Sequence, residues 1–274
     1  MWKKFVYVVP VIFLFTVNIQ AAELILSAPP RESKQDGEKL YTPLAEYLTQ
    51  RLGQPVKYNH PNSWFEYQND MRNNVYDIVF DGPHFASWRI EHLNHTALVK
   101  LPGSLKFHLV ALTDDETVRT TDELIGRYIC GISPPNLSTL TVLAHYSNPV
   151  RQPIIKGING GMGKVYKSLI AKKCSAGVLR SAFYKKKLKD KDREKVKIIF
   201  TSDPLPNQVI TASERISRAD VEKLRAGFIN SKEGGAALTP IRKRFAGKAK
   251  AFIPTDNQEY KDHNQLLEGV IFGW

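Results

Sequence analysis

The chain has 274 residues and a formal net charge of +12, with 39 Lys and Arg residues against 27 Asp and Glu residues. This length allows one large domain or two lobes of ordinary size, and the basic balance favours anionic partners. The most basic run, residues 185–197, interleaves three acidic residues and contains no aromatic residue. It lacks the stacking groups of a nucleic-acid surface, so we interpret it as a solvated segment and expect no nucleic-acid partner.

The first 22 residues have the pattern of a cleavable secretory signal peptide. Lys3 and Lys4 precede an apolar run of 13 residues from Phe5 to Val17, and Ala21-Ala22 supplies small residues for cleavage. The run is too short for a membrane-spanning helix, which needs roughly 20 apolar residues. Without the two lysines, 37 basic and 27 acidic residues leave a charge of +10. We therefore expect a soluble, exported and basic mature protein.

The first part of the mature chain alternates between strands and helices. Apolar runs predict strands over residues 24–28, 55–58 and 78–80, and a second helix over residues 64–73. The first helix is expected to start with Thr42 as its cap and Pro43 in its first turn, and to end at Gly53. Alternation of this kind indicates a parallel sheet covered by helices on both faces.

A sharp turn follows the third predicted strand. Asp81-Gly82-Pro83 stops the strand, and Pro83 suits the first position of a helix because that position needs no amide hydrogen. Ligands of open α/β sheets bind where strands end and helices begin. The turn is therefore a candidate pocket wall with Asp81 and His84 on its rim, although an ordinary strand-to-helix turn would have the same sequence.

A new α/β unit begins in the middle of the chain. After an extended run over residues 105–112, we expect strands over residues 128–132, 174–179 and 196–200, a helix from about Ser138, and a second extended run over residues 208–212. Ser217-x-x-Asp220 predicts the start of a later helix. Two extended runs around a compact unit suggest an inserted lobe, with residues 23–112 and 213–274 forming lobe 1 and residues 113–212 forming lobe 2.

The two cysteines, Cys130 and Cys174, lie at the ends of apolar runs that would form neighbouring strands. In an oxidising compartment, a small even number of cysteines suggests one disulfide bond. Two buried free thiols are the alternative that the sequence leaves open.

Four segments resemble, in their order and spacing, the phosphate/phosphonate-type (PhnD-like) periplasmic substrate-binding proteins of ABC importers. They are Tyr-Asp-Ile-Val-Phe-Asp-Gly-Pro over residues 76–83, Ser138-Thr139, residues 174–181 and residues 204–208. The resemblance implies an α/β, type II periplasmic-binding-protein fold, in which two hinge strands join two α/β lobes. It implies a periplasmic, non-enzymatic protein that captures a small oxyanion between the lobes and delivers it to an ABC permease.

The expected protein is a monomer with no cofactor and no metal. A ligand-sensing periplasmic protein that signals to a membrane kinase or chemoreceptor is the alternative function. His92 and His95 have the spacing of a metal pair on a helix but lack a third ligand, and Gly157 to Gly163 lacks the ending of a phosphate-binding loop.

The resemblance also implies a set of ligand contacts. Trp64 corresponds to an aromatic pocket wall, Asp81 to a position that faces the pocket, and Ser138 with Thr139 to a hydroxyl-rich helix start that holds an oxyanion. Either hydroxyl could equally be a simple helix cap. The full set of predicted ligand-binding residues is Arg31, Trp64, Asp81, His84, Asn136, Ser138, Thr139, Arg180, Asn207 and Gln208.

Arg180 departs from the family, whose aminoalkylphosphonate-binding members tend to have a carboxylate near this position. A guanidinium offers a planar fork to a second anionic group. We therefore hypothesise a ligand without an amine: phosphate, phosphite, a simple phosphonate or a larger dianion. A surface position for Arg180 remains open, and Cys174 replaces the usual aspartate of the family.

Overall fold

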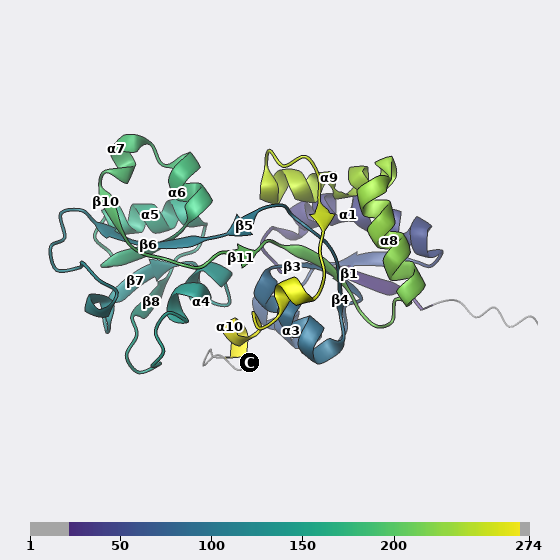
Figure 1. The fold of residues 1–274 in the computed structure, drawn as a ribbon, viewed down its shortest axis with the longest axis horizontal. Helices are drawn as coiled ribbons and strands as arrows, with labels where there is room; N and C mark the ends of the chain where they lie inside the picture. The colour runs from purple at the N-terminus through teal and green to yellow at the C-terminus, as the bar shows by residue number, and fades with distance from the viewer. Residues whose placement is uncertain (1–21, 269–274) are drawn as a thin grey trace, which may run out of the picture.

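The computed structural model describes residues 22–268. The predicted signal peptide, apart from Ala22, lies outside the described residues. Two separate sheets, each covered by helices, lie side by side along the longest axis of the molecule (Figure 1). We call the body around the first sheet lobe 1 and the body around the second sheet lobe 2.

Lobe 1 is built on a six-stranded sheet in the order β13-β4-β12-β3-β1-β2, which mixes parallel and antiparallel pairs. Helices α1, α8 and α9 cover one face and α3 covers the other (Figure 1). Its elements are β1 (Leu24–Ser27), α1 (Lys34–Leu52), β2 (Val56–Asn59), α2 (Trp64–Arg72), β3 (Ile78–Asp81), α3 (Pro83–Leu93), β4 (Thr96–Lys100), β12 (Val209–Ala212), α8 (Arg218–Asn230), α9 (Lys232–Ala246), β13 (Ile253–Pro254), the short helix η2 (Gln258–Tyr260) and α10 (Gln265–Glu268).

Lobe 2 is built on a five-stranded sheet in the order β10-β6-β9-β7-β8. Two apolar clusters pack on its two faces, one of them beneath α5 and the other beneath α4. Its elements are β6 (Phe107–Leu112), the short helix η1 (Asp122–Leu124), β7 (Tyr128–Gly131), α4 (Leu137–Leu143), β8 (Ile154–Gly157), α5 (Met162–Ile170), β9 (Ala176–Arg180), α6 (Ser181–Lys187), α7 (Asp190–Arg193) and β10 (Val196–Thr201).

Two short strands connect the lobes. β5 (Ser104–Leu105) and β11 (Leu205–Pro206) pair with each other in an antiparallel ribbon and lie between the two sheets in Figure 1. The chain thus crosses once in each direction, and the two hinge strands expected from the sequence are present. The type II fold class is confirmed.

The two segments that cross between the lobes lie before the lobe boundaries that the sequence suggested. β6 pairs with β9 and β10 in the second sheet, whereas the predicted boundary at residue 112 assigned it to lobe 1. β12 pairs with β3 and β4 in the first sheet, whereas the boundary at residue 213 assigned it to lobe 2. In each run the apolar residues belong to the sheet of one lobe, and the crossing is made by the short segment before them.

The first helix also starts earlier than predicted. α1 begins at Lys34 because the Ser33 hydroxyl accepts a hydrogen bond from the Asp36 amide, and Pro43 lies inside the helix. Leu40 and Tyr41 are buried on lobe 1 in the turn before the proline. Their burial favours a longer helix than the proline alone would indicate. The predicted cap of α8 is confirmed, since the Ser217 hydroxyl accepts from the Asp220 amide.

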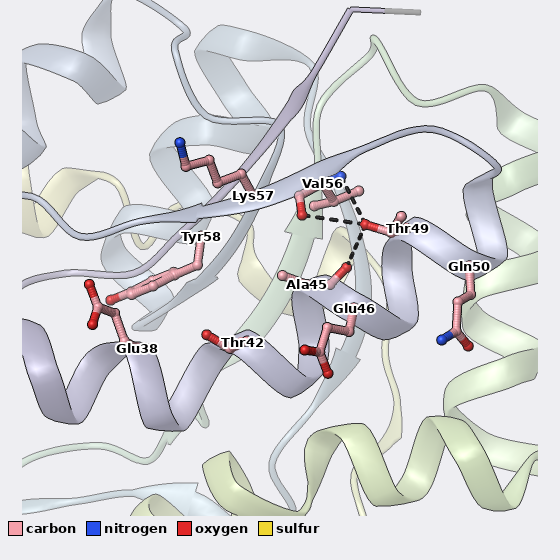
Figure 2. Close-up of a pocket in the computed structure, with 9 residues that line it drawn as sticks. All are labelled: Glu38, Thr42, Ala45, Glu46, Thr49, Gln50, Val56, Lys57 and Tyr58. Carbon is pink, nitrogen blue, oxygen red and sulfur yellow. Dashed lines mark hydrogen bonds between the residues drawn. The ribbon is translucent and has the colours of Figure 1, made fainter.

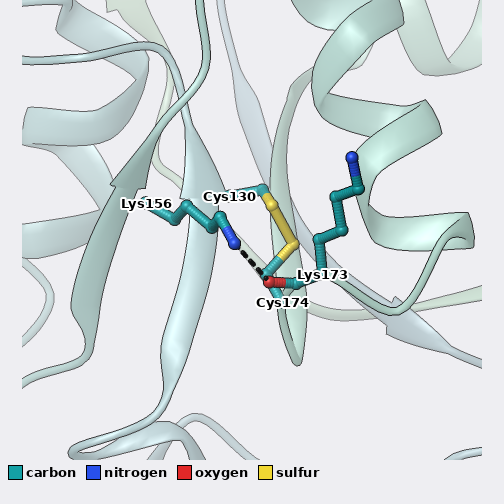
Figure 3. The surroundings of a disulfide bond; sticks show 4 residues. All are labelled: Cys130, Lys156, Lys173 and Cys174. Atoms are coloured by element: carbon teal, nitrogen blue, oxygen red, sulfur yellow. Dashed lines mark hydrogen bonds between the residues drawn. A yellow bond between two sulfur atoms is a disulfide. The ribbon is translucent and has the colours of Figure 1, made fainter.

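The predicted disulfide bond between Cys130 and Cys174 is present (Figure 3). Cys130 lies in β7 and Cys174 lies two residues before β9, and these two strands are parallel neighbours in the sheet. Beside the bond, the Lys156 ammonium donates to the Lys173 carbonyl oxygen at 3.3 Å. The bond thus joins a strand to a loop at one end of lobe 2.

Among residues 22–268, no helix combines the length and the apolar character needed to cross a lipid bilayer.

Candidate functional site

A cavity of about 180 Å³ lies between the lobes, where β1, β3, β7 and β9 end. Lobe 1 contributes the loop after β1 and the start of α3, and lobe 2 contributes the loop before α4 and the end of β9. Binding at the carboxyl ends of strands is the general rule for open α/β sheets. The lining residues are Pro29, Arg31, Trp64, Gly82, His84, Phe85, Leu105, Phe107, Pro135, Asn136, Leu137, Ser138, Met162, Arg180 and Gln208.

Seven of the ten predicted ligand residues line this cavity, and three do not. The seven come from six separate segments of the chain: Arg31, Trp64, His84, Asn136, Ser138, Arg180 and Gln208. The three others, Asp81, Thr139 and Asn207, are buried elsewhere with partners within the protein.

Asp81 does not line the cavity, because its carboxylate is hydrogen-bonded to two buried side chains of lobe 1. The Arg89 guanidinium donates to Asp81 Oδ2 at 2.9 Å, and the Tyr67 hydroxyl donates to Asp81 Oδ1 at 2.5 Å. Arg89 also donates to the Tyr67 oxygen at 2.7 Å, and all three side chains are fully buried. The prediction that Asp81 lies on the pocket rim is therefore wrong. Its carboxylate forms a buried ion pair with Arg89 instead.

Thr139 and Asn207 support the backbone beside the cavity. The Thr139 hydroxyl donates to the Ile132 carbonyl oxygen at 2.5 Å. The Asn207 amide group donates to the Pro102 carbonyl oxygen at 2.9 Å, which ties together the two segments that cross between the lobes. Both side chains thus order the loops that carry the lining residues.

His84 bridges the two lobes. Its Nε2 atom lies 3.0 Å from the Pro135 carbonyl oxygen. Because a carbonyl oxygen only accepts, Nε2 carries the proton. Burial lowers the pKa of His84 to about 3, so the ring is neutral at neutral pH. Its Nδ1 atom then bears a lone pair, and this atom is buried without a hydrogen-bond partner among the described residues.

The start of α4 is already capped from within the chain. Asn136 Oδ1 accepts hydrogen bonds from the Ser138 amide at 3.1 Å and from the Ser138 hydroxyl at 2.7 Å. Asn136, rather than Ser138 or Thr139, is therefore the N-cap. The Ser138 amide and hydroxyl, which were predicted to donate to an oxyanion, therefore already donate to the Asn136 side-chain oxygen.

Two arginines from opposite lobes supply the charge of the cavity. Arg31 of lobe 1 donates to the Phe80 carbonyl oxygen at 3.3 Å, and its guanidinium lies 4.6 Å from the centre of the Phe245 ring. Arg180 of lobe 2 is half-buried at the end of β9. Within residues 22–268, Arg31 forms no ion pair, and the Arg180 side chain forms neither a hydrogen bond nor an ion pair. Among the described residues, the lining contains no carboxylate.

The rest of the lining is mainly apolar. The Trp64 and Phe85 rings stack with their centroids 6.1 Å apart, and Leu105, Phe107 and Met162 extend the apolar wall. The sequence identified Trp64 but not Phe85, Leu105, Phe107 or Met162, since apolar side chains that line a cavity look like core residues in a linear pattern. Phe85 could have been proposed from the sequence, because it is an aromatic residue only three positions after Gly82 in the predicted pocket turn.

Another depression lies between α1 and β2 (Figure 2), where the Thr49 hydroxyl donates to the Ala45 carbonyl oxygen and accepts from the Val56 amide. The Thr49 hydroxyl thus holds the helix against the strand. Among the described residues, no group of three or more side chains could hold a metal ion. His92 pairs with Glu268, whereas His95 is buried beside Thr211.

Comparisons with known proteins agree with this architecture. The family profile described as "ABC transporter, phosphonate, periplasmic substrate-binding protein" matches residues 26–260. No curated protein is a significant match to the chain.

Solved structures share the fold at low sequence identity. The XAC2383 protein of Xanthomonas citri bound to ATP is 14% identical with a TM-score of 0.68, covering 91% of this chain and 99% of that one. PhnD1 of Prochlorococcus marinus in complex with methylphosphonate is 15% identical with a TM-score of 0.61, covering 90% and 97%. A binding protein component of an ABC phosphonate transporter from Pseudomonas aeruginosa is 14% identical with a TM-score of 0.60, covering 89% and 85%.

The profile match extends over most of the chain, from β1 to the short helix η2, and includes both lobes and both crossings. Proteins of this kind bind a substrate for an ABC transporter and are not enzymes. The resemblance inferred from the four sequence segments is confirmed. The chain belongs to the family of periplasmic substrate-binding proteins of phosphonate ABC transporters.

Proposed function

We propose that the protein binds a small phosphorus oxyanion that carries no amine, holds it in the cavity between the lobes and delivers it to an ABC permease. One observation carries this proposal. Within the part of the chain that the structure describes, the cavity is lined by Arg31 and Arg180 from opposite lobes and by no carboxylate.

The charge balance of the lining determines which ligands are stabilised. Removing a guanidinium from water is unfavourable unless an opposite charge compensates it, and neither arginine has an ion-pair partner among the described residues. An oxyanion would supply that compensation through charge-assisted hydrogen bonds, each worth roughly 1.5–3 kcal/mol. The ammonium group of an aminoalkylphosphonate would instead enter a positively charged cavity, where no carboxylate could pair with it.

The proposed mechanism is hinge closure about the ribbon of β5 and β11. A ligand that contacts Arg31 and Arg180 together interacts fully only when the lobes are closed, so it favours the closed state through its differential affinity. The hydrogen bond between His84 and the Pro135 carbonyl also joins the lobes in the closed arrangement. In this mechanism, the boundaries between the two lobes lie at the hinge strands β5 and β11.

We further propose that the mature protein is a periplasmic monomer released by cleavage after about residue 22. N-terminal sequencing of the exported protein tests the cleavage position. Size-exclusion chromatography with light scattering measures the mass of the protein in solution, which is expected to be that of one chain. A stable dimer or an uncleaved N-terminus would contradict this part of the proposal.

A thermal-shift screen of the mature protein tests the ligand class. The panel is phosphate, phosphite, methylphosphonate, 2-aminoethylphosphonate, sulfate, taurine and ATP, the last because the related Xanthomonas citri structure contains it. A ligand at one hundred times its dissociation constant stabilises the native state by about 2.7 kcal/mol. For a chain of this size, that raises the melting temperature by about 5–10 °C.

We expect a phosphorus oxyanion without an amine to give the largest shift. The shift should disappear in Arg31→Gln and persist in Lys34→Gln, which removes the same charge from an exposed position nearby. Circular dichroism of both unliganded variants establishes that they fold. The proposal fails if 2-aminoethylphosphonate or taurine gives the largest shift, or if no anion stabilises the protein.

A further inference from the structure

We propose that the cavity binds its phosphorus oxyanion in a protonated form, which keeps at least one P–OH group, and that His84 selects this form by accepting a hydrogen bond from the hydroxyl at Nδ1. This inference rests on the proposed function and specifies which ionisation state of the ligand the same cavity takes. A cavity of this kind discriminates between oxyanions of equal charge.

The Nδ1 atom of His84 is a buried acceptor. Nε2 lies 3.0 Å from the Pro135 carbonyl oxygen, which can only accept, so Nε2 holds the proton of the neutral ring. Nδ1 therefore presents a lone pair, and it is buried with no hydrogen-bond partner within residues 22–268. Burial lowers the pKa of His84, and the positive charge of Arg31 and that of His263, when protonated, lower it further, so the ring stays neutral.

A second acceptor without a partner lies in the same corner of the cavity. Gln208 Oε1 is buried and has no hydrogen-bond partner in the described part of the chain. Val209 pairs with Asp81 across the antiparallel strands β12 and β3, so Gln208 comes opposite Gly82. The imidazole of His84 lies over the same glycine, where a Cβ atom would come within 3.1 Å of Nδ1. Gly82, His84 and Gln208 all line the cavity.

The hydroxyl of Ser138 adds an acceptor from the other lobe. Its proton is already donated to Asn136 Oδ1 at 2.7 Å, so in this arrangement the oxygen offers only lone pairs to a ligand. Ser138 lies in α4 of lobe 2, whereas His84 lies in α3 of lobe 1 and Gln208 directly precedes β12 of lobe 1. The polar lining thus combines cations, which attract ionised oxygens, with acceptors on both lobes, which repel ionised oxygens and attract a proton donor.

A singly protonated phosphorus oxyanion satisfies both kinds of group. Its ionised oxygens accept from Arg31 and Arg180, and its hydroxyl donates to His84 Nδ1 without adding a positive charge. An ammonium group would also donate, but it would enter a cavity that two guanidiniums and, among residues 22–268, no carboxylate line. A sulfate or sulfonate has no hydroxyl near neutral pH, so its oxygens would face the acceptors. Sites built to hydrogen-bond a hydroxyl strongly reject analogues that lack it.

Isothermal titration at pH 6 with a matched pair of ligands tests the inference. Methylphosphonate and methanesulfonate each carry one methyl group and one negative charge at this pH, but only methylphosphonate has a hydroxyl. We expect wild-type protein to bind methylphosphonate roughly 30-fold more tightly, or better. In His84→Leu this ratio should fall by about fivefold or more, because methanesulfonate no longer meets the lone pair.

His92→Leu, at a partly exposed position outside the cavity, is the matched control and should keep the wild-type ratio within about twofold. In His84→Leu the bond to Pro135 is lost for both ligands alike. The weaker basicity of a sulfonate is the same in every variant. The change in the ratio therefore reports the Nδ1 acceptor.

A second measurement on wild type applies even if His84→Leu does not fold. At pH 9 free methylphosphonate carries two charges, so about one proton should be taken up with each molecule bound, as measured by titration in buffers of different ionisation enthalpy. Methylphosphonate binding without proton uptake, or equal affinities of the two ligands for wild type, overturns the inference while the proposed function stands. An unchanged ratio in a folded His84→Leu also overturns it. If no phosphorus oxyanion binds at all, both fail.

Discussion

The Nε2 atom of His84 lies 3.0 Å from the carbonyl oxygen of Pro135, and this buried hydrogen bond joins the two lobes at the edge of the cavity. The two residues belong to separate lobes and are 51 positions apart in the chain. Because the donor is in lobe 1 and the acceptor in lobe 2, separation of the lobes would break this bond. In the proposed mechanism of hinge closure, ligand binding and this contact favour the same state.

Replacing His84 should weaken ligand binding without removing a charge from the cavity. His84→Leu leaves the Pro135 carbonyl without its donor, and a hydrogen bond of this kind contributes about 0.5–1.5 kcal/mol. We expect the dissociation constant for the best phosphorus oxyanion to rise about 2- to 12-fold, measured by isothermal titration. His92→Leu, at a partly exposed position outside the cavity, is the matched control. Equal affinities of wild type and His84→Leu would show that the bond does not contribute to closure.

The same histidine should make the folded state sensitive to acid. Its folded-state pKa of about 3 lies below the ordinary value near 6.5, so between these limits the unfolded chain binds more protons. The stability contributed by neutral His84 is thus complete above about pH 6.5 and is lost as the pH falls towards 3.

Denaturant unfolding at pH 6 and pH 5 measures this effect. A single titrating group changes the free energy of unfolding by at most about 1.4 kcal/mol per pH unit. We expect His84→Gln to lose about 1 kcal/mol less than wild type over this interval. Burial also lowers the pKa of His60, His95, His108 and His263, so the variant should still lose stability in acid. A variant with an unchanged slope would contradict the buried, neutral state of His84.

The same substitution should destabilise the protein much more at Arg89 than at Arg180. Arg89→Met leaves the fully buried Asp81 carboxylate without its cation, and breaking a buried pair in this way costs about 3–5 kcal/mol. Arg180→Met removes a cation that has no ion-pair partner among residues 22–268, so the unliganded protein should lose little stability. Denaturant unfolding of both variants measures the difference. Similar losses in both would mean that Arg180 has a structural role.

The disulfide bond should stabilise the protein without affecting the cavity directly. Cys130 and Cys174 are 44 positions apart, and closing a loop of that length contributes roughly 4 kcal/mol in the chain-entropy interpretation. For the double variant Cys130→Ala/Cys174→Ala, we expect a melting temperature about 8–16 °C lower than that of wild type. Neither cysteine lines the cavity, so ligand affinity well below the melting temperature should be unchanged. A loss of affinity there would show coupling between the bond and the site.

Most of the fold could be predicted because its signals are local. Short apolar runs ending in turns marked β1, β3 and β7, and Ser217 with Asp220 marked the start of α8. The start of α1 was missed because burial of Leu40 and Tyr41 on the sheet outweighs the local signal of Pro43. The lobe boundaries were missed for a related reason, since strand pairing, which is non-local, assigns β6 and β12 to their sheets.

The site was harder to predict than the fold, because a residue type does not specify which way a side chain points. Asp81 and His84 flank the same turn, yet His84 lines the cavity while Asp81 turns towards Arg89, eight positions further along the chain. The sequence contains no signal for that pairing. Arg31 and Arg180 could be named from their positions after strands, but only the fold brings both to one cavity.

Isothermal titration of the mature wild-type protein with methylphosphonate and with 2-aminoethylphosphonate tests the central claim most directly. The two ligands share the phosphonate group and differ by the ammonium that would enter a cavity lined by two arginines and no carboxylate. We expect methylphosphonate to bind at least tenfold more tightly. Tighter binding of 2-aminoethylphosphonate, or no heat of binding with either ligand, would contradict the account.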